Sequence, residues 1–186
     1  LRQKTPNPQK TNVFQHQTPR YRNAIMEQFT LSEAVDLSRC CVDFPHFART
    51  YFQIDTTLNL DDFNHFTDLR TFELNVQEFK VLLVWYALFE RHKFIAIMAS
   101  TLTEAKHVLC EVALMMSSLP LHLQCDKTEQ LKLSMRLDNG NKIHCVACNS
   151  CSLRGQSVSL AMFFNTKQAN PKNLQDMLNG ILPVVC

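Results

Sequence analysis

The chain has 186 residues, of which 46% are hydrophobic and 19% are charged. This length and composition suit one globular domain with a substantial core and exclude a chain that is disordered throughout. The formal net charge of +2 is too small to indicate nucleic acid or a membrane surface as the partner. No apolar run approaches the roughly 20 residues that span a bilayer, so we expect a soluble protein with no membrane partner.

The eight cysteines are irregularly spaced, which does not suit a disulfide framework. The first residues, LRQKTPNPQK, also lack the apolar stretch of a signal peptide. We therefore expect the protein in a reducing compartment, with its thiols free.

Residues 1–28 are polar, contain three prolines and predict a flexible basic arm, followed by a globular domain over 29–186. The basic residues of the arm are Arg2, Lys4, Lys10, Arg20 and Arg22. Such an arm is either a solvated tail or a contact for DNA phosphates.

The first part of the domain predicts two short helices. Ser32 and Glu33 precede apolar residues at helical spacing, and FPHFARTYFQI, residues 44–54, carries aromatic residues at helical offsets, typical of a core-facing stripe. Residues 58–71 are acidic and irregular, and their scattered aspartates do not predict a metal site, because several oxygens would have to converge.

A longer α/β pattern follows. FELNVQEFKVLLVWYALFERHKF, residues 72–94, predicts a long helix, 94–99 a buried strand, and 103–118 a helix that stops before Pro120. This strand-to-helix order is typical of nucleotide-binding α/β proteins, but the junction has no glycine with which a loop could wrap phosphates.

A hairpin is the clearest local feature of the second half. Alternating apolar residues over 131–137 and 142–147 flank Asn139-Gly140, a pair that tolerates positive φ and is typical of hairpin turns. Residues 157–164 predict a buried strand, and NLQDMLNGILPVV, residues 173–185, a short helix ended by Gly180.

These elements, in this order, resemble the ATPase domain of the large terminase subunit, the motor that packages DNA into the heads of tailed bacteriophages. The resemblance runs from about Phe29 to the C terminus. It is carried by FPHFARTYFQI, FELNVQEF, HKFIAIMASTLTEAKHVLCEVALMMSSLP, LKLSMRLDNGNKIHCVACNSCSLRGQSV and LAMFFNTKQANPKNLQDMLNGILPVV. It implies viral genome packaging as the setting and the cytoplasm of the infected host cell as the location.

The resemblance also implies that two catalytic elements are missing. In the family, a strand and a phosphate loop ending in Gly-Lys-Thr precede the segment resembling HKFIAIMA, whereas here the helix at FELNVQEF runs straight into it. Family members end the strand resembling LAMFF with an Asp-Glu pair that positions Mg²⁺ and the attacking water. Here the strand ends in Phe164, Asn165 and Thr166, so we expect no catalytic residues and no ATP hydrolysis by this chain alone.

Two further family features are present. Gln77 falls where the family has a glutamine that reads the adenine edge, which makes it the single nucleotide-binding candidate, as a vestige; an exposed helical glutamine is the alternative. Arg154-Gly155 matches an Arg-Gly pair that precedes the metal-binding strand, and we expect Arg154 to be structural.

The segment HCVACNSC suggests a competing chemistry. His144, Cys145, Cys148 and Cys151 have spacings that zinc and iron–sulfur sites use, but the other cysteines form no second Cys-x-x-Cys. Cys145 also falls in the apolar phase of its strand. We therefore expect no metal and no cofactor at this segment, and small buried residues instead.

The fold class expected is α/β, with a reduced mixed sheet flanked by helices and derived from a P-loop ATPase-like domain that lacks its phosphate-loop strand. A missing central strand would leave unpaired backbone groups on its two neighbours. We therefore expect the remaining strands to pair with one another in a smaller sheet, with self-association across a sheet edge as an alternative. The expected function is that of a non-catalytic terminase-like protein that binds a packaging, capsid or other viral protein. The alternatives are an ATPase fragment completed by a partner chain and a cysteine-based module that binds metal or nucleic acid.

Overall fold

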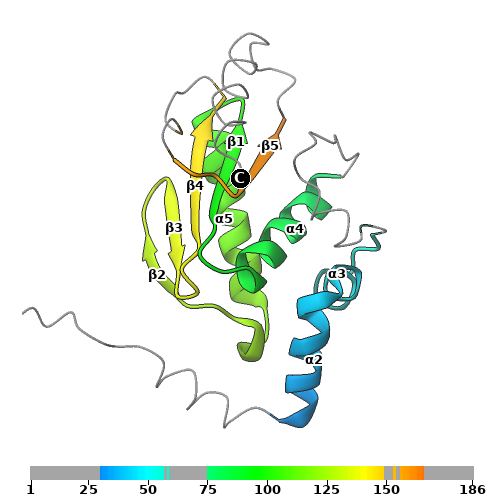
Figure 1. Ribbon diagram of the computed structural model, residues 1–186. Coiled ribbons are helices and arrows are strands. Elements are labelled where there is room, and N and C mark those ends of the chain that lie inside the picture. Colours follow the sequence, from blue (N-terminus) through cyan, green and yellow to red (C-terminus); the bar gives the residue numbers. More distant parts are fainter. Residues whose placement is uncertain (1–29, 57, 59–74, 149–152, 154–155, 166–186) are drawn as a thin grey trace, which may run out of the picture.

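The computed structural model describes residues 30–56, 58, 75–148, 153 and 156–165 (Figure 1). The predicted basic arm, most of the acidic segment, Arg154-Gly155 and the helix predicted over 173–185 lie outside these residues. No helix in the described part of the chain is long and apolar enough to cross a membrane.

A mixed, open five-stranded sheet forms the centre of the fold, with strand order β2-β3-β4-β1-β5. The strands are β1 (Phe94–Ala99), β2 (Lys127–Gln130), β3 (Ser134–Leu137), β4 (Lys142–Ala147) and β5 (Leu160–Phe164). The central strand β1 is parallel to both β4 and β5, whereas β3 is antiparallel to β4 and to β2. The predicted α/β class with a mixed sheet is therefore confirmed.

The predicted strand bounds agree with β1 and β4 and need correction elsewhere. The strand predicted over 131–137 is confined to Ser134–Leu137, because the chain turns at Leu131, whose N–H bonds the carbonyl of Ser134. The strand predicted over 157–164 begins at Leu160. Strand β2 was not predicted, since its four residues are all exposed and carry no apolar alternation.

Within the described residues, four helices and one short 3₁₀ turn accompany the sheet. They are α2 (Leu31–Val42), α3 (Phe44–Phe52), α4 (Val76–Phe89), α5 (Leu102–Ser118) and the 3₁₀ turn η2 (Leu121–Leu123). Reciprocal capping boxes start α2, from Thr30 and Glu33, and α4, from Asn75 and Glu78. The helix predicted over 72–94 is thus shorter within the described residues, because Asn75 caps it at one end and it stops at Phe89.

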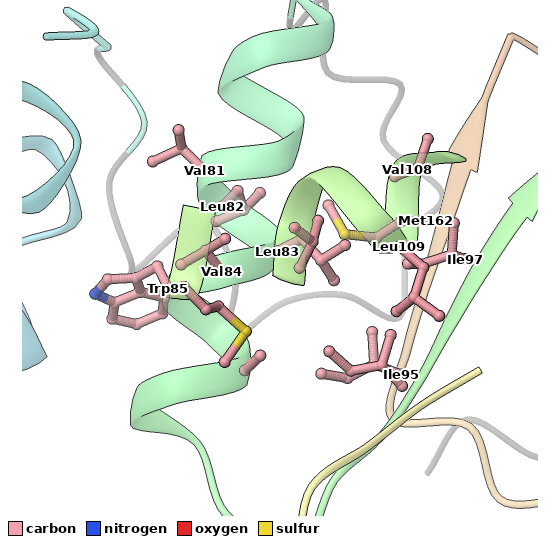
Figure 2. Packing of buried hydrophobic residues seen from close by; sticks show 14 of the residues in the cluster. Val81, Leu82, Leu83, Val84, Trp85, Ile95, Ile97, Val108, Leu109 and Met162 are labelled. Atoms are coloured by element: carbon pink, nitrogen blue, oxygen red, sulfur yellow. The ribbon is translucent and has the colours of Figure 1, made fainter. Parts of the chain in front are cut away.

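The main core lies between one face of the sheet and the helices. Helix α5 packs on β1 and β4, α4 packs on α5, and α3 packs on α4. Figure 2 shows Ile95 and Ile97 of β1 and Met162 of β5 on the side of the sheet where Leu109 of α5 lies. Alternate residues of the same strands, such as Met98 and Val146, are buried in a second cluster on the other face. Strand β1 is therefore covered on both faces, which explains its unbroken apolar sequence.

The hairpin turn between β3 and β4 caps the end of α4. Gly140 has φ +86°, as predicted for a glycine in this turn, but Asn139 keeps a negative φ and contributes its side chain instead. The side-chain amides of Asn139 and Asn141 both donate hydrogen bonds to the carbonyls of Ala87 and Glu90 at the end of α4. These asparagines satisfy helix carbonyls that would otherwise be orphaned, and they fix α4 against the sheet.

Candidate functional site

Open α/β sheets bind ligands at the carboxyl ends of their parallel strands. In this sheet the carboxyl ends of the parallel neighbours β1 and β5 are therefore the first place to look for a site. The chain leaves β1 through Ser100 and Thr101, and Thr101 caps α5 by accepting a hydrogen bond from the N–H of Glu104. It leaves β5 through Asn165, an exposed residue with φ +47°. This edge therefore contains the glycine-free junction after β1 and two of the residues, Phe164 and Asn165, at which the resemblance places an acidic pair.

A carboxylate occupies this edge. The Glu104 oxygens accept hydrogen bonds from the side-chain amide of Asn165, at 2.8 Å, and from the hydroxyl of Ser100, at 2.7 Å. These two hydrogen bonds, first that from Asn165, hold the pKa of Glu104 below its usual value. Glu104 is thus anionic at neutral pH and sits in the first turn of α5, where the positive end of the helix dipole would otherwise attract phosphate.

The two described residues at which the resemblance places an acidic pair are not acidic, and both side chains contact other residues. Phe164 is buried and stacks edge-to-face on Phe79 of α4, with ring centroids 5.4 Å apart, while Asn165 is held by Glu104. Thr166 lies outside the described residues.

Gln77 lies in the first turn of α4 and is exposed. Because Phe79 packs on Phe164, this turn lies near the carboxyl end of β5. Within the described residues the Gln77 side chain has no hydrogen-bond partner. Nucleotide binding by Gln77 stays a prediction.

The described residues of HCVACNSC do not converge. Cys145 faces α5 and donates to the carbonyl of Ala105, whereas His144 lies on the opposite face of β4, against the ring of Phe94. Cys148 belongs to the second cluster, with Val146. Burial raises the pKa of Cys145 to about 12 and also raises that of Cys148, so both are neutral thiols at pH 7. Cys151 lies outside the described residues.

A different polar cluster lies between α2, α3 and η2 and was not predicted from the sequence. It brings together Asp36 and Cys40 of α2 with His46 of α3, and one ligand atom from each lies within 4.8 Å of the others. Tyr51 of α3 and His122 of η2 complete it, both hydrogen-bonded to Asp36. Since η2 follows α5, this cluster lies at the opposite end of the sheet from Asn165 (Figure 1).

The sequence held one signal for this cluster. Asp36 and Cys40 are four residues apart on a predicted helix and therefore share a face. His46 and His122 reach them only because α3 folds back beside α2 and because η2 returns after α5. Those long-range placements come from the tertiary fold.

Comparison with known protein families found no family model that matches the chain, and no curated protein matches it.

Proposed function

We propose that this chain is a virus-encoded, non-catalytic relative of the terminase ATPase that acts in the cytoplasm of the infected host cell by binding a viral protein. The family blocks in the sequence support the relationship. The observation that carries the loss of catalysis is the pairing of Asn165 with Glu104 at the carboxyl edge of the sheet.

That pairing disfavours phosphoryl transfer for an electrostatic reason. The reaction needs cations and backbone N–H groups around the transferring phosphoryl group. At this edge the Glu104 carboxylate presents a negative charge beside the first turn of α5, and both of its oxygens already accept hydrogen bonds. A polyphosphate placed there would be repelled by this carboxylate and not bound.

The test is calorimetric titration of the full chain with Mg²⁺ and ATP, together with an ATP hydrolysis assay. We expect neither binding nor turnover. The Asn165→Asp variant restores an acidic residue at this position, and we expect it to remain inactive because the phosphate-binding amides are still missing. Tight Mg²⁺-dependent ATP binding with turnover by the unmodified chain would overturn the proposal.

The two edges of the sheet differ in a way that favours β5 as the binding surface. Edge strand β2 is exposed, contains charged residues such as Lys127 and Glu129, and has an irregular register against β3, all features that discourage strand addition. Strand β5 is apolar and, among the described strands, pairs only with β1. We infer that a partner adds an extended segment beside β5.

The register identifies the backbone groups involved. The carbonyl of Phe94 accepts from the N–H of Ser159, whereas the carbonyls of Lys93 and Ala99 accept from β4 or its ends, so the alternate residues Phe94, Ala96 and Met98 of β1 bond to β5. In the parallel register of the two strands, Ala161 and Phe163 therefore direct their N–H and C=O groups to the outer edge. Phe163→Pro removes one outward N–H and leaves the bonds to β1 in place. Phe163→Ala is the matched control, because it removes the same half-buried side chain and keeps the N–H.

Affinity capture from infected cells, followed by mass spectrometry, compares these two variants with the unmodified chain. We expect a viral protein to be captured by the unmodified chain and by Phe163→Ala, and to be lost with Phe163→Pro. Circular dichroism spectra of the variants check that both remain folded. Equal capture by the two variants would remove the β5 edge from the proposal, and capture of the chain's own copies alone would assign the edge to self-association.

A further inference from the structure

The spacing of Asp36, Cys40 and His46 is close to that of metal ligands, and the Cys40 thiol also donates a hydrogen bond to Asp36. Oδ1 of Asp36 lies 3.7 Å from Nε2 of His46 and 3.7 Å from Sγ of Cys40. The first distance is too long for an N–H···O hydrogen bond. Zinc bonds of about 2.0 Å to nitrogen or oxygen and about 2.3 Å to sulfur put tetrahedral ligand atoms about 3.3 to 3.5 Å apart.

We propose that Asp36, Cys40 and His46 bind a zinc ion, with Oδ1 of Asp36 as the shared corner of the ligand triangle. The three ligand atoms lie within 4.8 Å of one another, so they would close on the ion by side-chain rotation. This inference is independent of the proposed terminase-like function.

The other oxygen of Asp36 is held in place by neighbours. Oδ2 accepts hydrogen bonds from the hydroxyl of Tyr51 and from Nε2 of His122, the latter at 2.9 Å. Metal-binding carboxylates are commonly fixed in this way, because outer hydrogen bonds orient the oxygen that faces the ion.

The ligand chemistry selects the kind of ion. One thiolate, one imidazole and one carboxylate form a mixed set that suits Zn²⁺, whereas Ca²⁺ and Mg²⁺ require mostly oxygen ligands. Cys40 is fully buried, while the side chains of Asp36 and His46 are 25% and 22% exposed. The ion would therefore have its sulfur ligand toward the core and its fourth position toward solvent, where a water completes the tetrahedron.

The experiment titrates the full, metal-free chain with Co²⁺, which reports thiolate ligation by a charge-transfer band and tetrahedral geometry by its visible spectrum, and then displaces Co²⁺ with Zn²⁺. We expect one tight site per chain. Cys40→Ser and His46→Gln should each lose affinity by more than the roughly 10- to 100-fold typical of losing an outer hydrogen-bond partner, and Tyr51→Phe should fall within that range. Cys110→Ser and His107→Gln, identical changes at exposed positions of α5, are the matched controls and should bind like the unmodified chain.

X-ray absorption of the zinc-loaded, unmodified chain keeps the proposal testable if a variant fails to fold. One sulfur and three nitrogen or oxygen ligands support the site. Three or more sulfurs would place the ion on another set of cysteines and overturn it. The proposal is also overturned if the unmodified chain binds no tight ion, or if the control variants lose as much affinity as Cys40→Ser and His46→Gln.

Discussion

Replacing Asn141 with alanine should be among the more damaging single substitutions in this chain. Its side chain is fully buried and makes three hydrogen bonds, each to backbone. The amide donates to the carbonyls of Ala87 and Glu90, at 2.8 and 2.7 Å, and the side-chain oxygen accepts from the N–H of Lys93 at 2.7 Å. The residue thus joins the end of α4 to the start of β1.

The expected loss follows from which backbone groups keep a partner. The carbonyls of Ala87 and Glu90 would still accept from Asn139, so each loses about 0.5–1.5 kcal/mol of net hydrogen bonding. The N–H of Lys93 loses its described partner, at a cost of about 1–3 kcal/mol if it stays buried. The sum is about 2–6 kcal/mol, and we expect about 3 kcal/mol, because the start of β1 is only half-buried and water can reach it.

Urea denaturation measures this difference. Asn139→Ala removes the hydrogen bonds to the carbonyls of Ala87, Leu88 and Glu90 and the one accepted from the N–H of Asn141, so we expect a comparable loss from that variant. In a chain of this size a loss of about 3 kcal/mol also lowers the melting temperature by roughly 6–12 °C. A loss below about 1 kcal/mol for Asn141→Ala would refute the reasoning.

Three other expectations follow from the structure and sequence. Gly140→Ala should lower the free energy of unfolding by about 1–2 kcal/mol. The φ of +86° is strained for alanine, and the new Cβ would also lie 2.4 Å from Nδ1 of His92. In urea denaturation, a His92→Ala background should therefore recover only the part of the loss that comes from this steric contact. The hydrogen bond from Lys80 holds the pKa of Glu111 low, so its stabilising effect is present above the unfolded pKa near 4.5 and lost as pH falls through the lower folded pKa. Glu111→Gln should therefore flatten the decline of stability below about pH 4.5 in acid titrations, and an unchanged decline would exclude this pair as a cause. If residues 1–28 bind duplex DNA through their five basic residues, the affinity for DNA should fall with salt at a log–log slope of about −4 to −5. DNA retention by the chain should also disappear when residues 1–28 are deleted. DNA retention that survives the deletion, or no DNA retention by the intact chain at low salt, would remove DNA as a partner.

Local patterns predicted most of the described elements, for reasons visible in particular residues. Phe94–Ala99 is apolar throughout because both faces of β1 are buried, and the alternation around Asn139-Gly140 reflects a hairpin with one face on the helices. Strand β2 escaped prediction because it is held by pairing with β3 and not by burial. The start of α4 at Asn75 was also missed, although Asn75 and Glu78 have the spacing of a capping box, a signal that the sequence contains.

The candidate sites were less predictable, since they depend on contacts between distant residues. The sequence directed attention to HCVACNSC, but the strand geometry of β4 sends His144 and Cys145 to opposite faces. Conversely, Asp36 and His122 are 86 residues apart and meet only through the packing of η2 against α2. The partner of Asn165 was equally hidden, because Glu104 reaches it across the carboxyl ends of two parallel strands.

The position of β1 in the middle of the sheet has a consequence for protein synthesis. Its last residue, Ala99, pairs with Ala147 of β4 and with Phe164 of β5, the latter 65 residues further along the chain. At about 5–20 residues per second, a ribosome needs roughly 3–13 s to add those residues. During that interval an entirely apolar strand is exposed to the cell without its neighbour on that side, which makes this nascent chain a candidate for co-translational chaperone binding.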